Sequence, residues 1–318
     1  MKALIILWKY GDYICGKKLV AAIPGLMDAL IRFGEVDWDE ELQQSVREMS
    51  ASTIDRLLVR EKKKNGFKGL STTKPGTLLK RDIPVRMGTE WDDAKPGFLE
   101  IDLVAHCGDT TVGDYVNTLD ATDVVTGWTE VRAAVNKAQI HVISALMDIE
   151  GFLPFPLRGV DSDNGAEFIN DHLMRFCKTR ELKFTRSRPY RKNDGCHVEQ
   201  KNWSVVRKHM GYERYEGQET VDLMNAYYEL LGLYLNYFVP QTKLLSKERI
   251  DSHVKKKYDE YRTPYERVLA SPDVSPENKD YLREVYATLN PADLLRKMAL
   301  LQKKLQVVAL PYSGKRGS

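Results

Sequence analysis

The chain has 318 residues, of which 42% are hydrophobic and 29% are charged, and its net charge is +3. This length allows two or three domains with buried cores, and it excludes a miniprotein held together by disulfides. No stretch reaches the roughly 18 consecutive apolar residues that span a bilayer, and the four cysteines include no CxxC pair. We therefore expect a soluble, intracellular protein that is mostly folded.

Most of the positive charge lies in two windows of the sequence. Residues 56–81 contain nine lysines or arginines and one acid, and residues 178–192 contain seven and one. The rest of the chain is net negative. Windows of this density either neutralise nucleic acid phosphates or form solvated surfaces, and charge alone leaves both interpretations open.

The first ninety residues combine helical periodicity with irregular sequence. Apolar residues repeat at helical spacing up to Phe33, a polar helix is expected over 39–49, and Ser52 is predicted to cap a helix over 53–64. Two short helices joined by a tight turn resemble a helix-turn-helix, although any three-helix bundle offers a similar surface. We predict a DNA-binding region over 1–66, whose DNA contacts are Arg56, Arg60, Lys63 and Lys64.

Residues 67–96 are rich in glycine and proline and are predicted to form a linker. Beyond them, short strands alternate with helices, as is typical of an α/β domain with a mixed sheet. The first three strands are separated by turns short enough for antiparallel hairpins. The predicted order is βββαβαβα, with strands over 98–106, 111–119, 123–131, 157–160 and 182–185, and helices over 136–150, 166–180 and 193–210.

Several carboxylates fall at informative places in this pattern. Asp102 lies inside the first strand, where an acid is costly unless it is paired or holds a metal. Asp161 and Asp163 follow the fourth strand, and ligands collect at strand ends in open α/β sheets. Glu199 lies in the second turn of the last predicted helix. Any one of these acids fits a surface salt bridge, but acids from three elements could converge on one pocket.

These residues resemble the catalytic core of the DDE family, which contains retroviral integrases and bacterial insertion-sequence transposases. The resemblance rests on Asp102, on Asp163 within the segment DSDNGAEF, and on Glu199, with 35 residues between the last two. It implies an RNase H-like core of five strands over residues 97–215. The sequence pattern itself predicts a helical C-terminal region over 216–318. The chain has no His-His-Cys-Cys zinc module, so it is most similar to prokaryotic transposases, which commonly have a further helix-turn-helix before the position of Met1.

The resemblance implies metal-dependent DNA cleavage and strand transfer. Asp102, Asp163 and Glu199 would be the catalytic residues and also the ligands of two Mg²⁺ or Mn²⁺ ions, with Asp102 bridging both, because these ions prefer oxygen ligands. Asp161 competes with Asp163 for the second position, and Asp161 and Asn164 are otherwise expected to support the site.

Two other uses of these segments are disfavoured. An EF-hand that begins at Asp161 would need a glutamate at its twelfth position, which is His172. A two-metal site needs no histidine, so His106 and His197 are expected to be structural residues.

The implied partner is double-stranded DNA, both element ends and target, bound by a homo-oligomer in the cytoplasm of a prokaryote, in association with the nucleoid. Two alternatives are a non-catalytic DNA-binding protein derived from a transposase, and an RNase H-like nuclease without joining activity. The DNA contacts predicted around the last core helix are Arg186, Arg188, Arg191, Lys192, Lys201, Arg207 and Lys208.

The C-terminal region is predicted to contain two amphipathic helices. One has apolar residues in register from Leu223 to Tyr234, and the other runs from a cap at Asn290 to about residue 306. Between them, residues 246–257 are basic and predicted as a loop or connector, and residues 261–276 are expected to be irregular because they contain three prolines.

Overall fold

The computed structural model describes residues 1–64, 95–162, 171–186, 201–250 and 253–311. The chain forms two compact units. Unit 1 comprises residues 1–74, 233–267 and 282–296, and unit 2 comprises residues 75–232, 268–281 and 297–318. Each unit is therefore assembled from segments that are distant in sequence, whereas the division predicted above follows the chain order and remains a prediction.

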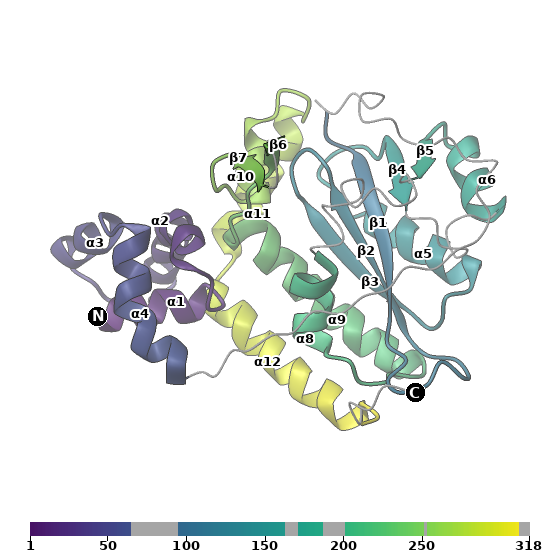
Figure 1. Ribbon diagram of the computed structural model, residues 1–318, viewed down its shortest axis with the longest axis horizontal. Helices are drawn as coiled ribbons and strands as arrows, with labels where there is room; N and C mark the ends of the chain where they lie inside the picture. The colour runs from purple at the N-terminus through teal and green to yellow at the C-terminus, as the bar shows by residue number, and fades with distance from the viewer. Residues whose placement is uncertain (65–94, 163–170, 187–200, 251–252, 312–318) are drawn as a thin grey trace. The chain divides into compact units, whose positions relative to one another are not determined.

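Unit 2 contains a mixed five-stranded sheet (Figure 1). Strand β1 lies at its centre, pairs antiparallel with β2 and parallel with β4, and the order is β3-β2-β1-β4-β5. This order, with three antiparallel strands followed by two parallel ones, confirms the predicted RNase H-like fold class. The strands are β1 (Phe98–Ala105), β2 (Asn117–Asp123), β3 (Thr129–Ala134), β4 (Gly159–Ser162) and β5 (Lys183–Arg186).

Four strands lie further along the chain than predicted, β5 by a single residue. Residues 107–116 form a loop, so β2 begins at Asn117 and not at 111. Asp123 ends β2, because its carboxylate accepts hydrogen bonds from the backbone N–H groups of Gly97 (2.7 Å) and Thr126 (2.6 Å) and so forms the turn before β3. Strand β4 extends through Ser162, which places Asp161 inside the strand and not beyond its end.

One face of the sheet is apolar and is covered by α5 (Gln139–Glu150) and α6 (Asp171–Thr179) (Figure 1). Alternate residues of a strand point to the same face, so a single set of positions on β1, β2 and β4 supplies this core. Helices α5 and α6 contribute the apolar residues of the side that faces the sheet, and all members of this core are buried. The core consists of Leu99, Ile101, Leu119, Ala121, Val142, Ala145, Leu146, Ile149, Leu157, Val160, Leu173 and Cys177.

The other face of the sheet is contacted by η1 (Asn202–Arg207), which forms a π-helical turn and continues into α8 (Lys208–Met210). The first part of α9 (Gln218–Phe238) also lies on this face, since the hydroxyl of Tyr228 is within 2.9 Å of that of Thr118 on β2. The helix predicted over 193–210 is thus confirmed from residue 201, the first residue described after the gap. The face of the sheet opposite the apolar core is therefore covered by η1 and by the first part of α9.

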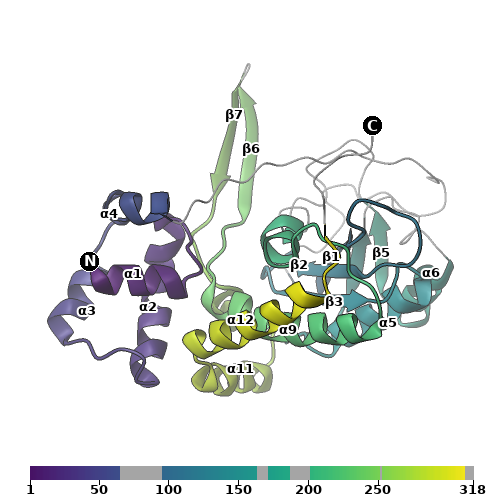
Figure 2. The same cartoon turned by 90° about the horizontal axis from the view of Figure 1, so that it is seen from below.

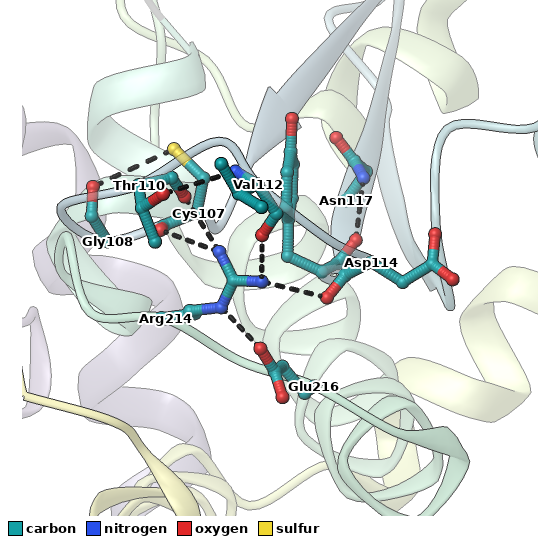
Figure 3. Close-up of polar contacts among 9 residues, drawn as sticks. Cys107, Gly108, Thr110, Val112, Asp114, Asn117, Arg214 and Glu216 are labelled. Atoms are coloured by element: carbon teal, nitrogen blue, oxygen red, sulfur yellow. Dashed lines mark hydrogen bonds and ion pairs between the residues drawn. The ribbon is translucent and has the colours of Figure 1, made fainter.

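The loop 107–116 is held by Arg214, which follows α8 (Figure 3). Its guanidinium donates to four backbone carbonyls, and its Nε donates to the carboxylate of Glu216. The side chain of Arg214 is only 10% exposed. The four carbonyls, at 2.7–3.2 Å, belong to Cys107, Thr110, Val112 and Asp114.

An Arg214→Lys variant is expected to be less stable than the wild type by about 2–3 kcal/mol. A lysine ammonium has three donors at one point, so it cannot reproduce the planar fork, and carbonyls of the loop lose their partners. Denaturant unfolding measures the difference. The matched control is Arg262→Lys, whose exposed side chain pairs with Glu260 and should change stability by less than about 0.5 kcal/mol. Equal effects of the two substitutions would contradict the proposed role of Arg214.

Unit 1 begins with four helices, α1 (Lys2–Tyr10), α2 (Gly16–Arg32), α3 (Glu40–Arg47) and α4 (Ala51–Lys64). Asp39 caps α3 by accepting from the backbone N–H of Leu42 at 2.8 Å. Ser50, and not the predicted Ser52, accepts from the N–H of Thr53 at the start of α4. Helices α3 and α4 follow one another with residues 48–50 between them, and their assignment as a helix-turn-helix remains a prediction.

The C-terminal region contains more regular structure than predicted. The basic segment 246–257 was predicted as a loop or connector, but it lies within an antiparallel hairpin of β6 (Leu244–Ile250) and β7 (His253–Tyr258) (Figure 2). The prediction was wrong because the many charged residues of both strands obscure the alternation of polar and apolar residues that is typical of a strand. The segment 261–276 includes α10 (Pro264–Ala270), where Pro264 occupies the first helical position.

Two further helices, α11 (Pro276–Thr288) and α12 (Pro291–Val308), complete the C-terminal region. The predicted cap of the last helix is confirmed, since Asn290 Oδ1 accepts from the N–H of Ala292 at 2.9 Å. Within the part of the chain that the structure describes, no helix is both long enough and apolar enough to cross a membrane.

Candidate active site

The strand register gathers polar side chains on the face of the sheet opposite the apolar core. Glu100 and Asp102 share this face of β1 by the two-residue period. Thr122 and Asp120 of β2 lie directly opposite them, and Asp161 of β4 lies beside Glu100. Paired residues of neighbouring strands point to the same side of a sheet. Carboxylates from the three adjacent strands β1, β2 and β4 therefore lie on the polar face of the sheet.

Asp102 is partly buried and is held from two directions. Its Oδ1 accepts from the backbone N–H of Leu103 at 2.7 Å, and its Oδ2 accepts from Nδ2 of Asn202, the first residue of η1. This bond ties the central strand to the helix that follows the Glu199 segment. Asp102 is thus fixed in position while remaining partly accessible.

Asp161 is more deeply buried than Asp102, with 1% of its surface exposed. The hydroxyl of Thr185 on β5 donates to Asp161 Oδ1 at 2.5 Å, which joins the two parallel strands by their side chains. Asp163 and Asn164, and Glu199 in the later segment, lie outside the described residues. The catalytic roles of Asp102, Asp163 and Glu199 therefore all remain predictions.

Asp120, which the sequence analysis did not select, lies opposite Asp102 and is fully buried. Among the residues that the structure describes, neither of its carboxylate oxygens has a hydrogen-bond partner. Burial raises the pKa of Asp120 to about 8, the negative charge of Asp102 adds to this effect, and the positive charge of Lys201 opposes it. The Thr122 hydroxyl, on the same face of β2, also lowers the pKa of Asp120.

Asp120 could have been found from the alternation of polar and apolar residues in its strand. Leu119 and Ala121 point to the apolar core, so Thr118, Asp120 and Thr122 must share the other face. Because the predicted second strand ended at residue 119, Asp120 fell in an expected turn and its strand position was missed.

The side chains around Asp102 fit a divalent cation by their chemistry. Carboxylate and amide oxygens are the ligands that Mg²⁺ prefers. Both oxygens of Asp120 and Oδ1 of Asn202 are buried and have no hydrogen-bond partner within the described part of the chain. Among the described residues, no group of three or more His, Cys, Asp and Glu is placed to hold a metal ion, and two of the three predicted ligands lie outside those residues.

The predicted DNA-contacting residues are placed only in part. Arg56, Arg60 and Lys63 are exposed on α4, and Lys208 is exposed on α8. Lys201 is partly buried and contributes positive charge to the surroundings of Asp120. The structure does not describe the side chains of Lys64 and Arg186, and Arg188, Arg191 and Lys192 lie outside the described residues.

Arg207 has a structural role within unit 2. Its Nη2 donates to the carbonyl of Ala105 at 2.8 Å, and its guanidinium lies 4.9 Å from the ring centroid of Tyr212. These contacts tie η1 to the end of β1. A DNA contact by Arg207 remains a prediction.

His106 is a buried structural residue, in agreement with the sequence analysis. Its Nε2 lies 2.8 Å from the hydroxyl of Thr118, and its ring meets that of Tyr215 edge to face at 5.6 Å. Burial lowers the pKa of His106 to about 3, and the charge of Arg207 adds to this effect. His106 is therefore neutral in the folded protein at neutral pH. His197 lies outside the described residues.

The strand order and the carboxylates on one face define a protein with an RNase H-like fold and a candidate site at the centre of its sheet. The chain is 40% identical over 262 residues to a protein of Sinorhizobium fredii named "Uncharacterized protein y4rM", and the match covers 81% of this chain and 73% of that protein. The chain therefore belongs to the family of y4rM. No protein-family model matches it.

Among solved structures, the chain is similar to retroviral integrase catalytic core domains. One is that of HTLV-2 integrase in complex with magnesium in a dimeric form, with 17% identity, a TM-score of 0.34, and coverage of 46% of this chain and 90% of that one. Another is that of BIV integrase, with 16% identity, a TM-score of 0.35, and coverage of 58% and 98%. The fold assignment rests on strand order and pairing.

Proposed function

We propose that this protein is a DNA transposase or integrase that cleaves DNA and joins strands through Asp102, Asp163 and Glu199. The observation that carries the proposal is the position of Asp102, in the central strand of an RNase H-like sheet and bonded to Asn202 three residues after Glu199. The motif around Asp163 supplies the sequence support for the second acid.

The protein's own residues hold and orient the reacting groups. The hydrogen bonds from Leu103 and Asn202 fix the carboxylate of Asp102, so that little reorganisation is needed when DNA binds. Bound Mg²⁺ or Mn²⁺ would supply activation of the attacking oxygen and stabilisation of the leaving oxygen. The acids at 163 and 199 would complete the ligand set.

We also propose that the exposed basic residues of α4 bind double-stranded DNA and that a homo-oligomer brings two DNA ends together. Arg56, Arg60 and Lys63 lie on the second helix of a helix-turn-helix-like pair, and basic residues so placed can neutralise phosphates. Residues 1–66 would then serve DNA binding and residues 97–215 catalysis.

The test compares wild type with Glu199→Gln for nicking and joining of supercoiled plasmid in Mn²⁺ or Mg²⁺. Glu199→Gln removes a charge while nearly keeping the shape, so we expect both activities to be lost. Glu219→Gln, an exposed position on α9, is the matched control and should behave as wild type. Joined products identify strand transfer, whereas nicks alone favour the nuclease. Equal inactivity of wild type and Glu199→Gln on plasmid and on DNA flanking the gene, with DNA binding retained, would favour the non-catalytic alternative.

A further inference from the structure

Asp120 is a buried acid beside the candidate site that the proposed function does not use. It is 0% exposed, and the antiparallel register of β1 and β2 sets it directly opposite Asp102. Opposite residues of such a pair have Cβ atoms about 4.5–5.5 Å apart on the same face of the sheet. Asp120 and Asp102 therefore present their carboxylates to the same region of the polar face.

The carboxylate of Asp120 lacks the partners that buried acids have. Among the described residues, neither oxygen has a hydrogen-bond partner, and the negative charge of Asp102, directly opposite on β1, repels it. Lys201, at the start of the helical segment over this face, contributes positive charge without bonding to it. A buried carboxylate without a hydrogen-bond partner is unusual unless it coordinates a metal or has another specific role.

A second unpartnered oxygen belongs to the side chain that holds Asp102. Asn202 Nδ2 donates to Asp102, and Asn202 Oδ1 is buried with no hydrogen-bond partner among the described residues. Two side chains next to Asp102, from β2 and from η1, thus carry buried oxygens to which no described residue donates. Carboxylate and amide oxygens are the donor types of a Mg²⁺ or Mn²⁺ site.

We propose that Asp120 is a further ligand of the divalent cation held by Asp102. The proposal rests on the proposed function, because it takes Asp102 to be a metal ligand. The proposed ligand lies on β2. The resemblance to the DDE family implied no metal ligand on that strand.

Binding of Mn²⁺ to the full-length protein tests the proposal without any DNA substrate. Free Mn²⁺ is measured by electron paramagnetic resonance during titration of wild type, Asp102→Asn, Asp120→Asn and the exposed control Asp222→Asn. We expect Asp102→Asn and Asp120→Asn each to weaken Mn²⁺ binding at least about tenfold, and Asp222→Asn to bind as wild type does. Circular dichroism verifies that each variant is folded.

A second variant, Asp120→Cys, tests direct coordination. A thiolate is a soft ligand that selects Cd²⁺ over Mg²⁺, so Cd²⁺ should produce a thiolate charge-transfer absorption in the ultraviolet beyond that of the wild-type cysteines. Unchanged Mn²⁺ affinity in Asp120→Asn, with affinity lost in Asp102→Asn and no added absorption in Asp120→Cys, would overturn the role of Asp120 alone. Absence of Mn²⁺ binding by the wild type would instead contradict the metal requirement of the proposed function.

Discussion

An Asp102→Asn variant is expected to lose DNA cleavage and strand transfer by about 10³-fold or more while keeping its fold. The substitution preserves shape, and Asn Oδ1 can still accept one of the bonds from Leu103 and Asn202. It removes the negative charge that the proposed site needs at its centre, and losses of one charged catalytic group reach this size. The measurement is the initial rate of plasmid nicking and of joining in saturating Mn²⁺, together with thermal unfolding.

An Asp161→Asn variant tests whether Asp161 or Asp163 is the second catalytic aspartate. Asp161 accepts from Thr185 at 2.5 Å within the sheet, and an asparagine oxygen can accept the same bond. If Asp163 is the second ligand, Asp161→Asn should retain most of the activity, with a decrease of about tenfold at most. Activity of Asp102→Asn equal to that of the wild type would exclude the proposed site, whatever the result for Asp161→Asn.

The order of the strands could be predicted because each strand has its own local pattern of residues. Asp102 was placed correctly since apolar neighbours on both sides define β1 as a buried strand. The bounds of β2 and β3 could not be predicted, because loop 107–116 is held by Arg214, about a hundred residues later in the chain. A pairing of this kind leaves no local signal near residue 110.

The same limit explains why Asp120 was missed and why the two units were not foreseen. Once the second strand is placed too early, Asp120 falls outside it, and its register with Asp102 cannot be derived. Unit 1 joins the first helices to residues 233–267 and 282–296, and contacts such as the pair of Glu35 with Arg296 depend on the tertiary fold. Periodicity predicts elements, but it does not predict which distant elements meet.

A second large effect is expected in the pH dependence of stability, and it concerns His106. The pKa of His106 is about 3 in the folded protein and about 6.5 in the unfolded chain. Between these two pH values the unfolded chain binds a proton at His106 and the folded protein does not. His106 therefore contributes stability that is fully present above pH 6.5 and is lost as the pH falls towards 3. The loss amounts to about 2 kcal/mol at pH 5 and about 4 kcal/mol at pH 3.

His106→Gln isolates this contribution from the other groups that titrate in acid. Glutamine does not titrate and can still reach the hydroxyl of Thr118, which itself lies 2.9 Å from that of Tyr228. We expect the variant to be less stable than the wild type at pH 8, since the ring contact with Tyr215 is lost. Urea unfolding at pH 8, 7, 6 and 5 should show the difference shrinking by about 2 kcal/mol between pH 8 and pH 5. A difference that stays constant over this range would mean that His106 takes up its proton equally in both states, and that burial does not hold it neutral.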